Sequence, residues 1–313
     1  MAQKLPFLSF IVPVKDEEKS LEKLLGEIEA VTKNNSSKHE IIFVDDGSID
    51  KSFQVIKKLK KTNKQVRCIK LRGNFGKSIA LMSGFKYARG DIIFTLDGDL
   101  QDNPKEVPKF LKKIAEGSDL VSGWKKKRYD PISKTIPSKI GNYLTRMLTG
   151  VGIHDLNCGF KAYRKEVVKN LKLSGELYKF IPIIASKDRF KVTEVIIEHR
   201  KRIYGKSKFG WERNIKGLLD LITVFFLTSY LRRPGHFFGT LGILFFTPGF
   251  FIGLYITYLR LATGTIDYRY PLLFLGALLM IVGVQFISTG LLAEMINAGR
   301  DDSLSDSYIT EVI

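Results

Sequence analysis

Two long apolar runs near the carboxyl end constrain the fold of this chain more than any other feature. They cover residues 234–258 and 270–293, and neither contains Asp, Glu, Lys or Arg. Each run is longer than the roughly 20 residues that a helix needs to cross a bilayer. The link between them is short, which predicts a transmembrane hairpin of two helices over residues 234–293, followed by a tail over residues 294–313.

Charge divides the chain in the same way. The formal net charge is +18, and Arg232 and Arg233 directly precede the first apolar run. The positive-inside bias predicts a multi-pass protein of the cell (inner) membrane, with residues 1–208 and the tail in the cytoplasm. Such a charge indicates an acidic partner, and the bilayer surface or a lipid phosphate accounts for it. The basic runs lack interleaved aromatic residues, so nucleic acid is not expected as a partner.

Residues 209–233 lie between these two parts and have a different pattern. Apolar residues such as Trp211, Ile215 and Leu218 recur at helical spacing, while charged residues such as Glu212 and Lys216 interrupt them. This pattern predicts an amphipathic helix at the membrane interface. A helix packed on the soluble domain is the alternative.

Residues 1–208 alternate between short runs rich in Val, Ile and Phe and longer segments with helical periodicity. The strand-like runs are residues 7–14, 40–45, 66–71, 91–97 and 119–122, and the helix-like segments are 17–33, 51–61, 77–88 and 104–116. This alternation predicts an α/β domain with a doubly wound, largely parallel sheet. In such sheets ligands bind at the carboxyl ends of the strands.

Acidic residues stand at those strand ends. Asp97-Gly98-Asp99 follows the fourth strand-like run, and Asp45-Asp46 closes the second. A turn at Gly98 brings both neighbouring carboxylates toward one Mg²⁺ or Mn²⁺ ion, which takes oxygen ligands. By itself an Asp-x-Asp is more typical of a solvated turn than of a metal site, and the neighbouring motifs are what favour the metal site here. Paired aspartates before a helix have no capping purpose, so at least one of Asp45 and Asp46 is expected to contact a ligand such as a nucleobase or ribose.

Together these motifs resemble those of the family 2 glycosyltransferases of GT-A fold. The resemblance is closer to the polyprenyl-phosphate branch, which includes dolichyl-phosphate mannose synthases and bacterial undecaprenyl-phosphate glucosyltransferases. It rests on residues 12–18, 44–48, 74–77, 97–102, 155–161 and 202–208, and on the membrane hairpin. The sequence departs from this pattern at Lys15-Asp16, where many relatives carry Tyr or Phe followed by Asn. The resemblance therefore does not specify the contacts to the nucleobase.

The resemblance implies roles for particular residues. The nucleoside pocket would contain Pro13, Val14, Glu17 and Asp46. Asp97 would lie near the ribose and the metal, and Asp99 and Gln101 would ligate the metal against the donor diphosphate. Arg202 would meet phosphate charge, with Lys206 and Lys208 close to it. The acceptor phosphate would be held by Arg128, Lys134 and Ser138, with Lys125 or Lys126 as alternatives to Arg128.

The expected reaction is transfer of a hexose from a nucleotide sugar to a polyprenyl phosphate, with inversion and metal-assisted departure of the nucleoside diphosphate. UDP-glucose is the preferred donor and GDP-mannose the alternative. Asp155 matches the position usually proposed as the base, but a phosphomonoester is already largely dianionic near pH 7, so Asp155 is expected mainly to orient the acceptor or the metal site. The competing interpretations are a processive polysaccharide synthase and a catalytically silent membrane scaffold.

The first apolar run contains glycines that are relevant to whether the protein forms oligomers in the membrane. Gly239, Gly242, Gly249 and Gly253 have the small-residue spacing that allows helices to pack closely in a membrane. A homo-oligomer is therefore compatible with the sequence.

Overall fold

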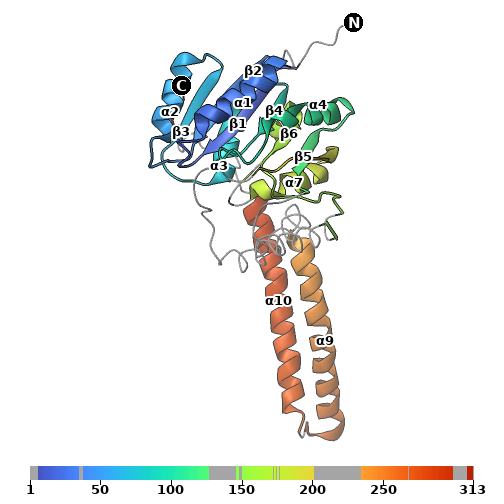
Figure 1. Cartoon of the computed structure of the whole chain (residues 1–313). Helices are drawn as coiled ribbons and strands as arrows, with labels where there is room; N and C mark the ends of the chain where they lie inside the picture. Colours follow the sequence, from blue (N-terminus) through green and yellow to red (C-terminus); the bar gives the residue numbers. More distant parts are fainter. Residues whose placement is uncertain are drawn as a thin grey trace. The chain divides into compact units, whose positions relative to one another are not determined.

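The computed structural model of the chain describes residues 6–34, 38–126, 146–147, 150–171, 173, 175, 177–200, 234–266, 268–298 and 309–312 (Figure 1). The chain divides into two compact units. The first comprises Met1–Val224 together with Ser303–Ile313, and the second is Phe225–Asp302.

The first unit is built on a sheet with the strand order β7-β5-β6-β4-β1-β2-β3-β8. Its centre consists of β1 (Leu8–Val14), β2 (His39–Asp45), β3 (Val66–Leu71) and β4 (Ile92–Thr95), which pair in parallel in the order β3-β2-β1-β4. The chain adds β2 and β3 on one side of β1 and then crosses to add β4 on the other side. This reversal creates a switch point between β1 and β4, where α/β sheets bind ligands.

Helices cover both faces of the central strands, as the sequence predicts. One face carries α1 (Leu21–Asn34), α2 (Ser52–Thr62) and α4 (Val107–Ala115), which follows the 3-10 turn η1 (Pro104–Glu106). The other carries α3 (Lys77–Tyr87), α6 (Lys165–Asn170) and α7 (Ile181–Lys187). Phe10 and Phe94 stack within the first of these cores at 5.1 Å between ring centroids. Because both faces are buried, the central strands are mostly apolar rather than alternating, although β3 carries Arg67 and Lys70.

The outer strands complete the sheet with mixed directions. β6 (Lys161–Arg164) runs antiparallel to both β4 and β5 (Leu120–Trp124), and β7 (Val192–Ile196) runs parallel to β5. At the opposite edge, β8 (Ile309–Val312) pairs antiparallel with β3, and Lys57 of α2 lies 3.2 Å from Glu311 Oε1. The last described residues of the chain therefore belong to the same sheet as the first.

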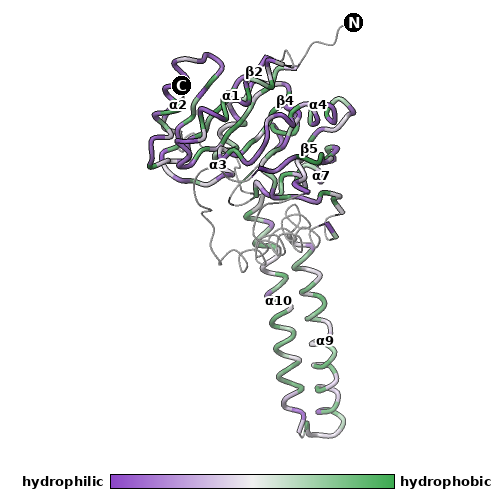
Figure 2. Tube along the Cα trace, in the orientation of Figure 1, coloured by the Kyte–Doolittle hydropathy of each residue, from purple (hydrophilic) through white to green (hydrophobic). Residues whose placement is uncertain are grey.

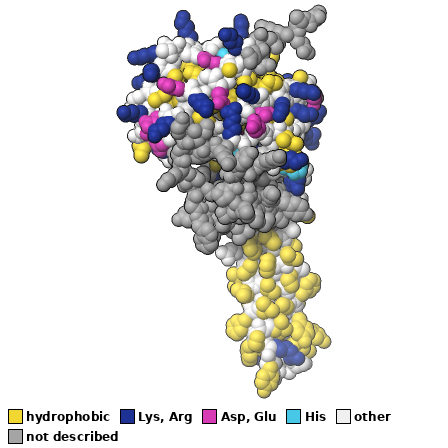
Figure 3. Space-filling view, in the orientation of Figure 1, with side chains coloured by type: hydrophobic (Ala, Val, Ile, Leu, Met, Phe, Trp, Pro, Cys, Tyr) yellow, Lys and Arg dark blue, Asp and Glu magenta, His cyan; other side chains and the backbone are white. Residues whose placement is uncertain are grey.

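The second unit contains two long apolar helices, α9 (Pro234–Thr263) and α10 (Tyr270–Ala298). Their lengths and compositions are sufficient to cross a membrane over residues Gly235–Thr263 and Tyr270–Ile296. Both helices are hydrophobic along most of their length (Figure 2), and hydrophobic side chains dominate the face of them seen in Figure 3. The helices are longer than the apolar runs that predict them, because helical pairing continues into the polar flanks.

Glycines bring the backbones of α9 and α10 close together in three successive pairs. Each glycine of a pair faces the other across the helix interface: Gly235 with Gly290, Gly242 with Gly283, and Gly249 with Gly276. A Cβ on Gly242 would lie 2.7 Å from the carbonyl oxygen of Gly283, and a Cβ on Gly283 would lie 2.7 Å from that of Gly242. The spacing of seven residues on each helix places every pair on one face, since seven residues make about two turns.

Candidate active site

The candidate site lies at the carboxyl ends of β1, β2 and β4. Val14 ends β1, and its carbonyl accepts a hydrogen bond from Asp46 N at 2.9 Å. A Cβ on Gly98 would lie 3.5 Å from Pro13 O and 3.6 Å from Glu17 Cγ, so Pro13 and Glu17 border the turn that follows β4. The structure thus brings together four residues expected at the nucleoside pocket, namely Pro13, Val14, Glu17 and Asp46.

Asp46 organises the loop between β3 and α3. Its two carboxylate oxygens accept backbone hydrogen bonds, from Phe75 N at 2.8 Å and from Gly76 N at 3.0 Å. Burial raises the pKa of Asp46, and the two backbone bonds oppose this shift because they favour the ionised carboxylate. Asp46 therefore holds the loop between β3 and α3, a role that the sequence does not reveal.

Asp97 follows β4 and forms an ion pair with Lys77 at the start of α3. Burial acts to raise the pKa of Asp97, but the positive charges of Lys77 and Lys125 outweigh it and lower the pKa below its ordinary value. The carboxylate is consequently held in its charged form. The Lys77 ammonium also lies 5.2 Å from the centroid of the Tyr178 ring, between α3 and the η2 segment Leu177–Phe180.

The turn after Asp97 has an unusual backbone. The sequence indicates that Gly98 supplies the conformational freedom, but the left-handed residue is Leu100, with φ at 63°. Such a conformation is costly for a leucine and occurs mainly where the surrounding structure enforces it. Here Leu100 is buried in the core, and Asp99 Oδ1 accepts a hydrogen bond from Gln101 N at 3.1 Å across the turn.

The segment after β7 runs alongside this turn. Asp102 and His199 form an antiparallel bridge, and Arg200 N donates to Gln101 O at 3.0 Å. The Arg200 guanidinium lies 2.7 Å from Glu27 of α1 and 2.5 Å from Asn103 Oδ1. The chain is therefore anchored beside Gln101 two residues before Arg202.

The loop before β6 contacts the turn after β4 directly. Thr95 Oγ1 donates to Gly159 O at 2.7 Å, and a Cβ on Gly159 would lie 2.5 Å from Asp97 Oδ2. Asp155 begins this loop, is buried, and accepts a hydrogen bond from Lys125 N at 3.4 Å. Motifs 62 residues apart in sequence, those of Asp97 and Gly159, are thereby packed against each other.

A buried lysine lies beneath this loop. Lys161 Nζ donates to the carbonyl oxygens of Cys158 and, at 3.5 Å, of Leu156. Burial lowers the pKa of Lys161, while the carboxylates of Asp155 and Asp97 oppose this shift. Lys161 therefore ties the loop together from inside, through its hydrogen bonds to two of the loop's carbonyl oxygens.

An aromatic stack borders the loop on its exposed side. The rings of Trp124 and His154 are parallel within 12°, with centroids 4.2 Å apart. Glu194 of β7 accepts a hydrogen bond from His154 N at 2.8 Å and also contacts ring Nδ1. This arrangement joins His154, the residue next to Asp155, to both β5 and β7.

Several predicted residues lie outside the described part of the chain: Arg128, Lys134, Ser138, Arg202, Lys206 and Lys208. The same holds for the amphipathic helix expected over residues 209–233. The residues that sequence reasoning did not assign to the site, and that contact it, are Lys77, Asp102, Gly159, Lys161 and Arg200. Four of these residues belong to the motifs on which the family resemblance rests: Lys77, Asp102, Gly159 and Lys161. Membership of a motif is the sequence feature that could have pointed to them.

The donor atoms suit a hard divalent cation without forming a complete cage. Asp97, Asp99 and Gln101 offer carboxylate and carboxamide oxygens, the ligand type that Mg²⁺ and Mn²⁺ prefer. Among the described residues, no group of three or more His, Cys, Asp and Glu side chains could hold a metal ion. Such a site would need oxygen atoms from a bound diphosphate, as magnesium sites in phosphate-transferring proteins commonly do.

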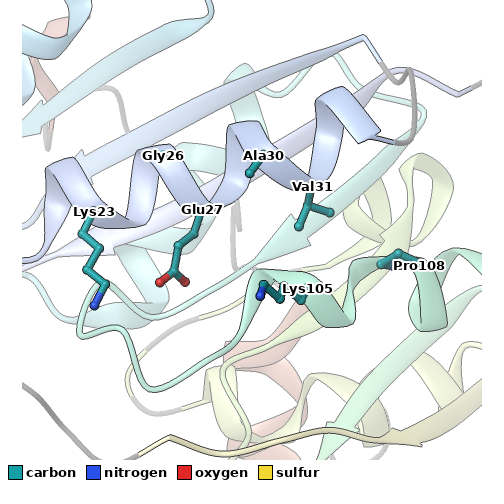
Figure 4. A pocket seen from close by; sticks show the side chains of 7 residues that line it. All are labelled: Lys23, Gly26, Glu27, Ala30, Val31, Lys105 and Pro108. Atoms are coloured by element: carbon teal, nitrogen blue, oxygen red, sulfur yellow. The ribbon is translucent and has the colours of Figure 1, made fainter.

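A separate groove of about 550 Å³ lies between α1 and the η1–α4 segment. Its lining residues are Lys23, Gly26, Glu27, Ala30, Val31, Lys105 and Pro108 (Figure 4). None of the predicted site residues lines it. The ion pair of Glu27 with Arg200 connects this groove to the segment beside Gln101.

Comparison with known proteins agrees with this geometry. The family model described as Glycosyl transferase family 2 matches residues 9–172, which contain the Asp46, Asp97 and Asp155 motifs. The chain belongs to glycosyl transferase family 2. It is therefore a glycosyltransferase. The matched region ends just after β6 and α6, the elements that follow the Asp155 loop.

Two relatives of this family 2 glycosyltransferase match it over nearly its full length. Dodecaprenyl-phosphate galacturonate synthase from Rhizobium johnstonii is 37% identical, covering 98% of this chain and 92% of the relative. Undecaprenyl-phosphate 4-deoxy-4-formamido-L-arabinose transferase from Shewanella sediminis is 35% identical, covering 94% and 88%. The coverage includes the apolar helices as well as the sheet.

Solved structures share the fold of the first unit. Glucosyl-3-phosphoglycerate synthase from Mycobacterium tuberculosis, crystallised with Mn²⁺, uridine-diphosphate-glucose and phosphoglyceric acid, has a TM-score of 0.55 at 18% identity. The likeness covers 70% of this chain and 80% of that chain. It shows the GT-A type of fold that the motifs predict.

Proposed function

We propose that this protein transfers a hexose from a nucleotide sugar to the phosphate of a polyprenyl phosphate at the cytoplasmic face of the membrane. The observation that carries the proposal is the packing of Gly159 against Asp97, which brings the Asp155 loop to the carboxyl ends of β1 and β4. The nucleoside-side residues and the residue expected to face the acceptor then border one site. The two relatives named above, which both act with polyprenyl phosphates, support the choice of acceptor.

The proposed reaction is a single displacement. An oxygen of the acceptor phosphate forms a bond to the anomeric carbon while the bond from that carbon to the donor diphosphate breaks, and the nucleoside diphosphate leaves with the electron pair. The acceptor has a second pKa of about 6 and is mostly dianionic at neutral pH, so no proton has to be removed. Inversion at the anomeric carbon follows, because no enzyme nucleophile takes part.

Charge on the leaving group must be balanced. A Mg²⁺ or Mn²⁺ ion held by Asp97, Asp99 and Gln101 would neutralise part of the charge on the leaving diphosphate. Arg202 and the nearby Lys206 and Lys208 are proposed to add positive charge from the protein. Arg200 is the last described residue before this segment, and its backbone N–H donates a hydrogen bond to the carbonyl oxygen of Gln101.

The pairing of β8 with β3 supports the proposed membrane orientation. Residues before α9 and residues after α10 both belong to the sheet of the first unit. If α9 and α10 each cross the bilayer, both ends of the hairpin emerge on the side of that sheet. The positive-inside bias supports the assignment of this side to the cytoplasm. Reporter fusions after Ile313 and within residues 264–269 should accordingly report opposite sides.

The proposal is tested with membranes that contain the full chain. They are incubated with undecaprenyl phosphate, Mg²⁺ or Mn²⁺, and a panel of radiolabelled donors, and the label extracted into organic solvent is counted. UDP-glucose is the first donor and GDP-mannose the second, and the relatives' products add galacturonate and formamido-arabinose donors to the panel. Extractable label is expected from one donor. Membranes that contain the Asp99→Asn variant should lose this label, which shows that it does not come from other enzymes in the membranes. No extractable label from any donor would refute the proposal.

A further inference from the structure

The sequence allows Lys125 to bind the acceptor phosphate, but the side chain of Lys125 does not point to solvent as such a residue would. It directly follows β5 and stands beside the exposed Lys126, at the start of a basic run. Its ammonium nevertheless faces the interior, where Nζ lies 2.8 Å from Asp102 Oδ1. The side chain of Lys125 is 13% exposed and that of Asp102 is 0% exposed. The pair is thus withdrawn from solvent.

The Lys125 ammonium and the Asp102 carboxylate form a buried ion pair. Burial alone would lower the pKa of Lys125, but the carboxylate of Asp102 outweighs burial and raises that pKa above its ordinary value. A buried charge that loses its partner is strongly destabilising. An incoming phosphate therefore cannot take the Lys125 ammonium without leaving the Asp102 carboxylate uncompensated.

The pair connects two parts of the candidate site. Asp102 Oδ2 accepts a hydrogen bond from Asp97 N at 3.3 Å, at the turn after β4. Lys125 N donates to Asp155 Oδ2 at 3.4 Å, in the loop before β6. One residue therefore acts on the Asp97 turn through its side chain and on Asp155 through its backbone.

We propose that Lys125 is a positioning residue that keeps Asp155 and Asp97 in register, through its ion pair with Asp102 and its backbone hydrogen bond to Asp155. The kinetic part of this inference rests on the proposed function. Its structural part does not, because the order of the Asp155 loop can be measured without turnover.

The test compares Lys125→Met with Lys113→Met in the full chain. Lys113 forms an ion pair of similar length with Glu116, at 2.7 Å, but on the exposed surface of α4. Hydrogen–deuterium exchange is measured on peptides that cover residues 96–103 and 153–161. Faster exchange in both peptides is expected for Lys125→Met and not for Lys113→Met. Unchanged exchange in residues 153–161 overturns the inference, whether or not the protein is active.

Kinetics then separates positioning from acceptor binding. Displacement of a reacting group by about 1 Å costs up to about 100-fold in rate, so a fall in kcat of about 10- to 100-fold is expected for Lys125→Met, with the KM for donor changed less than about 2-fold. A higher KM for polyprenyl phosphate at an unchanged kcat would instead assign Lys125 to the acceptor phosphate and overturn the inference.

A double variant covers the case in which Lys125→Met folds poorly. Asp102→Asn combined with Lys125→Met removes both buried charges, so the thermal midpoint is expected to recover toward that of the wild type. The kcat per folded molecule should stay low, because the ion pair is still missing. Recovery of midpoint and kcat together would mean that Lys125 acts on folding alone, and a wild type without transfer from any donor would contradict the proposed function instead.

Discussion

Gly159 lies so close to Asp97 that a Cβ on the glycine would fall 2.5 Å from the aspartate Oδ2 and 2.7 Å from its Cγ. The contact couples the Asp-Gly-Asp turn to the loop that begins with Asp155. A side chain at residue 159 would displace the Asp97 carboxylate, which forms an ion pair with Lys77.

Gly159→Ala should therefore reduce turnover while the protein stays folded. We expect kcat to fall by about 100-fold, the scale of a 1 Å displacement of reacting groups. Gly152→Ala is the matched control, because a Cβ there meets nothing within 4 Å. Equal rates for the two variants, measured at equal amounts of folded protein, would contradict the coupling of the two loops.

Glu194→Gln should loosen the support of Asp155. Glu194 accepts the backbone hydrogen bond of His154 and contacts its ring, and a hydrogen bond to a charged group contributes about 1.5–3 kcal/mol. We expect kcat to decrease by about 10-fold with little change in the KM for donor. Glu166→Gln, at an exposed position of α6, serves as the control and should leave both constants unchanged.

Asp155→Asn distinguishes orientation from proton removal. The acceptor phosphate is mostly a monoanion below its second pKa of about 6 and mostly a dianion above it. If Asp155 orients the acceptor, the variant loses activity to the same degree from pH 5.5 to 8.5. A loss confined to pH values below about 6 would show instead that Asp155 takes the proton of the monoanion.

The two cysteines should resist alkylation in the folded protein. Burial raises the pKa of the Cys68 thiol to about 12, and that of Cys158 likewise to about 12. The reactive thiolate is therefore scarce at pH 8.5. We expect no labelling by iodoacetamide at pH 8.5 in the native state and labelling of both residues in denaturant, as read by mass spectrometry. Rapid native labelling of either residue would contradict the buried placement.

Gly283→Leu should weaken the hairpin of α9 and α10. A side chain there would meet Gly242 O and Phe246 Cβ, each at 2.7 Å, whereas a Cβ on Gly239 meets nothing within 4 Å. Overpacking costs about 1–3 kcal/mol, so we expect a lower thermal midpoint for Gly283→Leu in detergent and an unchanged midpoint for Gly239→Leu. The glycine pairs would have no stabilising role if both variants unfolded at the wild-type temperature.

The sequence predicts the central sheet well because its strands are buried on both faces and are therefore mostly apolar. It also predicts that Asp46 and Asp97 lie at one edge, since parallel strands end together. The antiparallel β6 is harder to find, because it is only four residues long and begins and ends with the charged residues Lys161 and Arg164. The inward direction of Lys125 could not be predicted either, since it depends on a partner, Asp102, that is distant in sequence and hidden in the interior.

The place of β8 in the sheet has a consequence for biosynthesis. The outer edge of β3 stays without its partner strand until residues 309–312 have left the ribosome, which happens only after both apolar helices have been synthesised. Unpaired strand edges invite association with other chains. The edge of β3 therefore stays unpaired in the nascent protein while α9 and α10 are synthesised. The sheet of the first unit can be completed only after these apolar helices have been made.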